Sequence, residues 1–291
     1  MHGVGETTAA ITVVNALPTG IGSAIGIDIK ARAEIDLHPS GSHGKWDVKI
    51  AERARSPLVI SSLTEALRRF APGSSGTGEL TLHSEIPLAR GLKSSSAVSS
   101  AVVLAVARAT DAEVLPIDVA RISATVSTSI GLSATGALDD ALAGLSTGVV
   151  VTDNRRGELL KSYPTESKLG VVLYIPNVAH APSPAWVSAF AAEEATSRVA
   201  VDAALRGDWV AAMGENTQLV ERVLQYEYGP LRAELLRRGA IASGVSGMGP
   251  ALAAVAPRGR LREVAEAFPG TPETRRTVTF SGDPAAGGSM K

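Results

Sequence analysis

Cysteine is absent from the 291-residue sequence, and aromatic residues and net charge are scarce. Without cysteine the chain has no disulfide, no thiolate metal site and no cysteine nucleophile. The net charge of −1 provides no broad basic surface, so we expect neither nucleic acid nor membrane lipid as a partner. Aromatic residues make up only 4 % of the chain, so its core must be built from alanine, valine, leucine and isoleucine.

Long apolar segments are also missing. No run of 18 or more apolar residues occurs, and no charged segment leads into an apolar run at the N-terminus. We therefore predict neither a membrane span nor a signal peptide, and we expect a cytoplasmic protein. The hydrophobic content of 45 % and the charged content of 20 % are ordinary for a folded chain with one large or two ordinary domains.

Strand-like and helix-like segments are mixed along the chain without regular alternation. Alternating or β-branched runs predict strands at 9–14, 27–37, 79–86, 149–152 and 169–176. Helical spacing predicts helices at 57–70, 94–110 and 116–129, and at least two more that meet near Gly207 and Asp208. Turn residues predict loops at 15–26 and 131–148, and the tail 283–291 is expected to be disordered. This mixture favours an α+β fold in two halves over a doubly wound sheet.

The segment IPLARGLKSSSAVSSAVVLAVARAT, residues 86–110, places three serines at the start of a small-residue helix. Serine is a good N-cap, and the free N–H groups and dipole of a helix start favour a phosphate. Gly91 lets the backbone approach a ligand, Lys93 adds a positive charge, and serine hydroxyls suit Mg²⁺. A capped helix after a turn explains the same residues equally well. The Walker A pattern does not fit, because it requires glycine where Pro87 and Leu92 stand.

Four sequence blocks resemble those of the GHMP kinases, and in particular their archaeal-type shikimate kinase branch. The segment PLARGLKSSSA resembles the loop P-x-x-x-G-L-G-S-S-A-A, with Lys93 in place of the second loop glycine, a departure typical of that branch. The other blocks are residues 2–35, SATGALDDALAG at 133–144 and SGVSGMGPALAAV at 243–255. The four occur in the family's order over most of the chain.

The resemblance implies a two-domain fold, with an N-terminal half like ribosomal protein S5 domain 2 and a ferredoxin-like C-terminal half. We set the halves at 1–160 and 161–291. ATP is expected in the N-terminal half, with Mg²⁺, and Ser95 is the expected magnesium ligand. The residues implied to bind ATP are Pro87, Leu88, Ala89, Arg90, Gly91, Leu92, Lys93, Ser94, Ser95, Ser96 and Ala97.

Asp139 and Asp140 are adjacent in a loop rich in glycine and hydroxyl residues. A carboxylate can accept the proton of an alcohol or hold Mg²⁺, but one aspartate could equally cap a helix while the other is solvated. Similarity to the galactokinase pattern Gly-x-x-Asp and the mevalonate kinase pattern Asp-Asn-Ala implies that Asp139 is the catalytic acid. Asp140 then raises the pKa of Asp139 by like charge. The magnesium-binding glutamate of many family members has no counterpart in 123–131.

The remaining glycine loops have weaker signals. Residues 19–26 contain G-x-G-x-x-x-G, but a strand-like segment follows, whereas a dinucleotide-binding unit requires a helix. The resemblance implies that this segment forms one wall of the substrate pocket, and an ordinary hairpin turn is the alternative. The family places the glycine loop at 244–249 beside the nucleotide loop, although a structural turn explains its glycines nearly as well. The expected substrate-binding residues are Thr19, Gly20, Gly136 and Gly247.

The resemblance implies transfer of the ATP γ-phosphate to a hydroxyl of shikimate, by a monomer or a homodimer. Another GHMP kinase that acts on homoserine, pantoate or mevalonate is the nearest alternative, and a non-catalytic binding protein or a dinucleotide-dependent enzyme is a more distant one. An arginine fork suits the shikimate carboxylate, and the spacing does not select among Lys30, Arg155, Arg156, Arg275 and Arg276. The histidines, at 2, 38, 43, 83 and 180, show no metal-ligand spacing.

Overall fold

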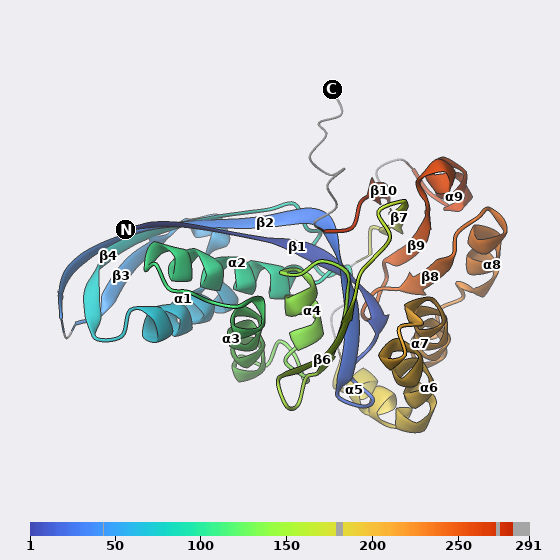
Figure 1. Cartoon of the computed structure of the whole chain (residues 1–291), viewed down its shortest axis with the longest axis horizontal. Helices are drawn as coiled ribbons and strands as arrows, with labels where there is room; N and C mark the ends of the chain where they lie inside the picture. The colour runs from blue at the N-terminus through green and yellow to red at the C-terminus, as the bar shows by residue number, and fades with distance from the viewer. Residues whose placement is uncertain (43, 179–182, 272–273, 282–291) are drawn as a thin grey trace.

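The computed structural model describes residues 1–42, 44–178, 183–271 and 274–281, and within them it contains two β-sheets (Figure 1). The six-stranded sheet has the order β3-β4-β2-β5-β6, with β1 paired to β2, and the four-stranded sheet has the order β10-β7-β9-β8. The strands of the first sheet are β1 (His2–Val14), β2 (Ile21–Ser42), β3 (Trp46–Ile50), β4 (Ser74–Ser84), β5 (Val149–Asp153) and β6 (Glu158–Tyr163). Those of the second are β7 (Leu169–Tyr174), β8 (Ala242–Val245), β9 (Leu252–Pro257) and β10 (Arg275–Val278).

Helices lie beside both sheets, which confirms the α+β prediction. Four follow one another along one face of the first sheet: α1 (Pro57–Phe70), α2 (Ser94–Ala109), α3 (Pro116–Ser129) and α4 (Leu138–Ala143) (Figure 1). The C-terminal half carries α5 (Pro184–Ala191), α6 (Glu194–Leu205), α7 (Trp209–Leu224), α8 (Gly229–Arg237) and α9 (Leu261–Ala267). Short 3₁₀ turns occur at Glu52–Ala54 and Arg258–Arg260.

Helix α2 lies directly on β1, and its composition explains why. It consists almost entirely of Ser, Ala and Val, and most of its residues are buried. Gly3 and Gly5 of β1 face it, and a β-carbon on either glycine would come within 2.1 Å of a carbonyl oxygen of α2. Small residues on both elements thus let the backbones approach closely, which fixes the N-terminus of α2 relative to the end of β1.

Several segments differ from the sequence predictions, and β1 already begins at His2 instead of Ala9. Strand β2 begins at Ile21 instead of Ile27, because its glycine-rich start pairs with β1 on one side and with β5 on the other. Strand β4 likewise begins at Ser74 instead of Glu79, paired between β2 and β3. Pairing on two sides outweighs the low strand propensity of glycine and serine. The short helix α4 lies inside the predicted loop 131–148 and carries both adjacent aspartates. The tail 283–291 lies outside the described residues.

Candidate active site

Helix α2 begins at Ser94, as the sequence predicts, but the residue that caps it is Lys93 rather than a serine. Lys93 has a left-handed backbone, with φ 65° and ψ 30°, and its side chain makes no capping hydrogen bond. The left-handed conformation favours glycine, which explains why a related loop can have glycine at this position. The expectation of a serine N-cap is therefore wrong, because all three serines are already inside the helix.

The serines of the first turn are placed differently from one another. Ser94 is buried, and within the described residues its Oγ has no hydrogen-bond partner. Ser95 is exposed, whereas Ser96 is buried toward the core. The first turn therefore presents backbone N–H groups without a side-chain cap, together with one unpaired and one exposed hydroxyl.

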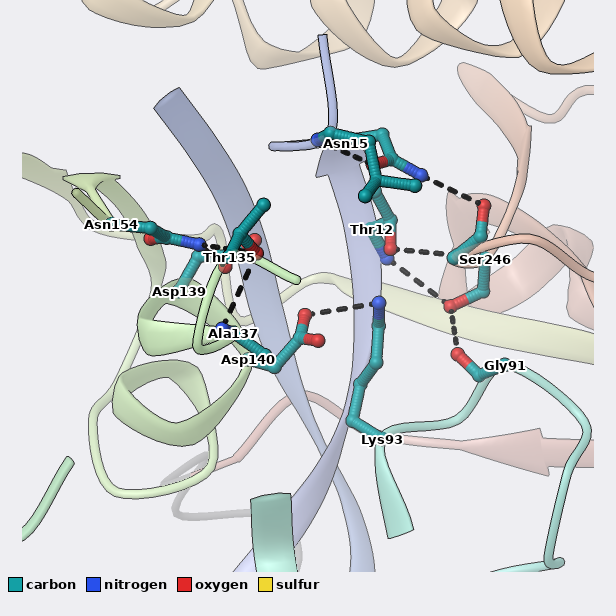
Figure 2. Close-up of polar contacts among 12 residues, drawn as sticks. Thr12, Asn15, Gly91, Lys93, Thr135, Ala137, Asp139, Asp140, Asn154 and Ser246 are labelled. Carbon is teal, nitrogen blue, oxygen red and sulfur yellow. Dashed lines mark hydrogen bonds and ion pairs between the residues drawn. The ribbon is translucent and has the colours of Figure 1, made fainter. Parts of the chain in front are cut away.

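A loop from the C-terminal half braces the segment before α2 (Figure 2). The hydroxyl of Ser246 donates to the Gly91 carbonyl oxygen at 2.8 Å and accepts from the backbone N–H of Thr12 at 3.2 Å. The Ala251 N–H donates to the Arg90 carbonyl oxygen at 3.2 Å. Gly91 has φ 85°, and a β-carbon there would lie 2.1 Å from the Ser246 carbonyl oxygen. Glycine is thus required at residue 91 for this contact between the two halves.

The adjacent Gly247 connects the same loop to the end of β1. Its N–H donates to Thr12 Oγ1 at 2.8 Å, and its carbonyl oxygen accepts from Asn15 Nδ2 at 3.4 Å. Asn15 is held in turn by Asn216 of α7, whose Oδ1 accepts the Asn15 N–H at 2.8 Å. A β-carbon on Gly247 would lie 3.2 Å from the Lys93 ammonium. The glycine loop therefore lies beside both the segment before α2 and its lysine.

Lys93 also connects α2 to the aspartates of α4 (Figure 2). Its Nζ lies 3.0 Å from Asp140 Oδ1, and the two side chains are only 11 % and 14 % exposed. The first turn of α2 and the first turn of α4 are therefore joined by the length of one lysine side chain. A cation, a carboxylate and a helix N-terminus meet here in a partly desolvated space.

Asp139 lies next to this ion pair and is 4 % exposed. Asn154 Nδ2 donates to Asp139 Oδ1 at 2.8 Å (Figure 2). Thr152 Oγ1 donates to Asn154 Oδ1 at 2.6 Å, which fixes the orientation of the amide. Burial raises the pKa of Asp139 to about 7, and the charge of Asp140 adds to the rise, as the sequence predicts. Lys93 and the Asn154 hydrogen bond act in the opposite direction.

The carboxylate fits against β2 only because residue 22 is glycine. A β-carbon on Gly22 would lie 2.4 Å from Asp139 Oδ2. The preceding turn places Gly136 and Ala137 in left-handed conformations, with φ 81° and 55°. Thr135 Oγ1 accepts from the Ala137 N–H and from Asn154 Nδ2, both at 3.4 Å. Strand β2, the turn before α4 and the end of β5 thus jointly fix the acid.

Thr19 and Gly20 form the turn before β2, close to the same place. The Thr19 hydroxyl accepts from the Ile21 N–H at 3.0 Å, and the Gly20 carbonyl oxygen accepts from the Asn154 N–H at 2.9 Å. The structure therefore brings Gly20 and Asp139 together through Asn154. A β-carbon on Gly136 would lie 3.2–3.4 Å from atoms of Thr128 and Ala124 in α3.

A pocket of about 660 Å³ opens beside the first turn of α2. Its lining is Arg53, Ala54, Ser56, Pro57, Leu58, Val59, Leu82, His83, Ser84, Ile86, Leu88, Ser94, Ser95, Val98, Ile130 and Leu132. Most of these side chains are apolar, and Leu88 and Leu132 remain 75 % and 51 % exposed. The pocket therefore combines an apolar wall with the serines at the start of α2.

Side chains that could form a metal site of their own are not grouped in the described part of the chain. Among the described residues, no group of three or more histidine, aspartate or glutamate side chains could hold an ion, and His43 and His180 lie outside them. Helix α3 buries the hydroxyl residues Ser123 and Ser127 and carries no glutamate. Within the described residues, no helix has the length and apolarity to span a bilayer.

Several residues of this site were not identified from the sequence. Asn154, Thr152, Thr12, Asn15 and Ser246 carry no local signal, because each is an ordinary polar residue at the end of a strand or in a turn. Only the pairing of β1, β2 and β5, with the approach of the C-terminal loop, brings them to the aspartates.

Comparisons with known proteins show which sequences and folds this chain is similar to. The family model described as GHMP kinases N terminal domain matches residues 58–148, and the one described as GHMP kinases C terminal matches 200–273. The shikimate kinase of Pyrococcus furiosus is 35 % identical over 88 % of this chain and 92 % of its own. The shikimate kinase of Methanocella arvoryzae is 35 % identical, and the match covers 93 % of this chain and 92 % of its own. The shikimate kinase of Halobacterium salinarum is 32 % identical, and the match covers 96 % of this chain and 97 % of its own.

Solved structures show the same fold at low sequence identity. Methanococcus jannaschii mevalonate kinase superposes with a TM-score of 0.73 at 14 % identity, covering 96 % of this chain and 98 % of its own. Lactococcus lactis galactokinase superposes with a TM-score of 0.67 at 13 % identity, covering 96 % of this chain and 93 % of its own. With two family models in order, curated relatives above 30 % identity along nearly the whole chain, and the two-domain fold of known members, this chain belongs to the GHMP kinase family.

Proposed function

We propose that this chain is a shikimate kinase, which transfers the γ-phosphate of ATP to a hydroxyl of shikimate and releases ADP. The observation that carries the proposal is the junction of two parts needed for phosphoryl transfer. The open N-terminus of α2 suits the phosphates, and a buried acid with a pKa near 7 lies just across the Lys93–Asp140 ion pair. The choice of shikimate as the acceptor rests on the relatives, which are named shikimate kinases and are similar to this chain over nearly their whole lengths.

ATP fits the loop 87–97 and the pocket beside it. The uncapped N–H groups of α2 and its dipole favour the phosphates, and the unpaired hydroxyl of Ser94 is a further donor. The exposed apolar side chains of Leu88 and Leu132, at the pocket rim, suit the flat face of a base. The Ser246–Gly91 contact holds the loop so that its backbone is already placed when the nucleotide arrives.

Asp139 acts as the general base in this proposal. It accepts the proton of the shikimate hydroxyl as that oxygen bonds to the γ-phosphorus, and the bond from phosphorus to the β,γ-bridging oxygen breaks to release ADP. Asn154 Nδ2 donates a hydrogen bond to Asp139 Oδ1. Among the described residues, no side chain donates to Asp139 Oδ2, so this oxygen is available to the substrate hydroxyl. A pKa near 7 leaves the carboxylate able both to exist ionised at neutral pH and to hold the proton afterwards.

Mg²⁺ accompanies the nucleotide, and the oxygen donors at the site fit it. The exposed Ser95 hydroxyl and the second oxygen of Asp140 are hard donors that would hold the ion. When bound, the ion neutralises charge on the phosphates. The scarcity of carboxylates suits an ion held largely by phosphates and water.

The proposed substrate space lies between the two halves. Gly20 is linked to Asp139 through Asn154, Gly136 lies in the turn before Asp139, and Gly247 lies beside Lys93. Thr19 belongs to the same turn as Gly20. We assign the nucleotide and the acid to a domain of residues 1–160 and the bracing loop to a domain of residues 161–291. All of these groups come from one chain, so a monomer or a homodimer can perform the reaction, in the cytoplasm.

The test is an ADP-release assay with ATP and Mg²⁺ on shikimate, homoserine, pantoate and mevalonate. The proposal predicts turnover on shikimate with the highest kcat/KM. Turnover on another alcohol, but none on shikimate, contradicts the substrate and leaves the kinase chemistry standing. An Asp139→Ala variant that retains the wild-type function favours a binding protein. The dinucleotide alternative receives no support, since β2 rather than a helix follows Gly20.

A further inference from the structure

We propose that Arg155 binds the carboxylate of the acceptor, so that this site selects hydroxy acids over neutral alcohols. The inference rests on the proposed function for its chemistry, but it concerns a residue that the function does not assign. It commits to a ligand class, a small polyol with a carboxylate, and to the order in which its groups lie in the proposed substrate space. The hydroxyl faces Asp139 and the carboxylate faces the turn between β5 and β6.

The other candidate cations already have partners. Lys30 Nζ lies 3.0 Å from Glu6 Oε1, Arg156 Nε lies 3.7 Å from Asp153 Oδ2, and Arg276 Nη2 lies 3.1 Å from Glu85 Oε2. The first pair joins β1 and β2, the second lies in the turn after β5, and the third joins β10 to the segment after β4. Their charges are at least partly compensated, so a substrate carboxylate gains less from them than from an unpaired cation.

Arg275 and Lys93 are engaged as well. Arg275 Nη2 donates to the Gly270 carbonyl oxygen at 2.8 Å, in the C-terminal half. Lys93 is committed to Asp140 and to the nucleotide side of the site. Among the described residues, no carboxylate or carbonyl oxygen pairs with the guanidinium of Arg155. Arg155 is exposed, and it is therefore the candidate whose full donor set is available to a ligand.

The position of Arg155 is fixed by its neighbours. It follows Asn154, whose side chain holds Asp139 and whose N–H donates to the Gly20 carbonyl oxygen. The side chain of Arg155 then crosses the turn at Gly20, where a β-carbon would lie 2.6 Å from its Nε and 2.8 Å from its Cδ. Gly20 thus provides the space through which the arginine side chain passes, just as Gly22 provides the space for the Asp139 carboxylate.

The upper limit on the distance between Arg155 and Asp139 admits a hydroxy acid the size of a six-membered ring. Gly20 and Gly22 are two residues apart, and from backbone dimensions Arg155 Nε lies within about 15 Å of Asp139 Oδ2. A ring with C–C bonds of about 1.5 Å that carries both groups spans roughly 5–7 Å between its outer oxygens. With a hydrogen bond of about 2.8 Å at either end, such an acceptor reaches across about 11–13 Å, which lies below this upper limit. The planar fork of arginine can bind a carboxylate through two parallel hydrogen bonds.

Arg155→Gln and Arg156→Gln form a matched pair of variants for the test. Both residues are exposed in the same turn, so neither change should prevent folding. The inference predicts that Arg155→Gln raises KM for shikimate at least about 10-fold while KM for ATP and Tm stay near wild type. Arg156→Gln should leave all three values unchanged, and Arg155→Lys should recover part of the loss. An unchanged shikimate KM in Arg155→Gln would overturn the inference.

A neutral substrate analogue supplies the second measurement. The wild type should phosphorylate the methyl ester of shikimate with kcat/KM at least about 10-fold below that for the acid, and Arg155→Gln should not distinguish the two. Equal discrimination by the wild type and Arg155→Gln contradicts the inference. If the wild type instead prefers homoserine, pantoate or mevalonate, the proposed substrate fails separately. All three are hydroxy acids, so the KM effect of Arg155→Gln on the preferred one still decides the role of Arg155.

Discussion

Lys93, the N-cap of α2, forms an ion pair with Asp140 in the first turn of α4, with Nζ 3.0 Å from Oδ1 and both side chains largely buried. This contact joins the segment expected to hold the phosphates to the segment that carries the acid. It also accounts for a lysine at a position whose left-handed backbone favours glycine. The backbone cost of about 1–2 kcal/mol is offset by neutralisation of a buried carboxylate.

Replacement of Lys93 separates these two contributions. Lys93→Met leaves Asp140 buried without its cation and should lower the free energy of unfolding by about 3–5 kcal/mol. Lys93→Gly loses the same ion pair but relieves the left-handed backbone, so it should be about 1 kcal/mol more stable than Lys93→Met. Urea unfolding measures both. A Lys93→Met variant as stable as the wild type would show that the pair contributes nothing.

Loss of the Asn154 hydrogen bond should alter the pH dependence. Asp139 must be ionised to accept a proton, so kcat/KM for shikimate should fall below a pH near its pKa of about 7. Asn154 stabilises the ionised form, so Asn154→Ala should move this fall in activity to higher pH. Thr152→Val, which frees the amide to rotate, should move it in the same direction, and Thr152→Ser should not. Identical pH profiles for all four proteins would rule out this positioning role.

Gly22→Ala should displace the Asp139 carboxylate, because the new β-carbon would lie 2.4 Å from Oδ2. A displacement of about 1 Å can cost 10²-fold in rate, so kcat should fall by about that factor while KM for ATP changes little. Gly214→Ala in α7 is the matched control. Nothing lies within 4 Å of its added carbon, and alanine should stabilise the helix by roughly 0.5–1 kcal/mol with unchanged kcat. Full activity of Gly22→Ala would contradict the placement of the acid.

Asp139 should also make the fold less stable as the pH rises. The pKa of Asp139 is about 7 in the folded chain, whereas the ordinary value for an aspartate, which applies to the unfolded chain, is 3.8. The folded state therefore holds this proton more tightly than the unfolded state does. Its contribution to stability is therefore complete below pH 4 and is lost as the pH rises through 7. Asp139→Asn should match the wild type near pH 4 and exceed it at pH 8 by up to about 4 kcal/mol. Denaturant unfolding at both pH values measures this, and a variant less stable at pH 8 would reverse the expected sign.

Local signals in the sequence were enough to identify the regular helices and the position of the loop before α2. Pro57 and Pro116 begin their helices at the predicted residues, and the junction at Gly207 and Asp208 separates α6 from α7. In each case proline or glycine and apolar spacing act within one segment. The like-charge effect of Asp140 on Asp139 followed from their adjacency alone.

Features that depend on contacts between distant segments could not be predicted in this way. Nothing near Asn154 indicates that its amide meets Asp139, since the pairing of β2 with β5 creates that contact. The early start of β2 has the same origin. Lys93 was expected to serve the phosphates alone, and only the approach of α4 to α2 reveals its partner Asp140.

The most direct test of the account is a single-turnover measurement of shikimate phosphorylation at pH 8 by wild type and Asp139→Asn, with saturating ATP and Mg²⁺. The variant keeps the size of the side chain and can still accept the Asn154 hydrogen bond, so ATP affinity should be unchanged. The account predicts a rate of phosphoshikimate formation about 10²- to 10⁴-fold below wild type. A rate close to that of the wild type would contradict the role of Asp139 as the base.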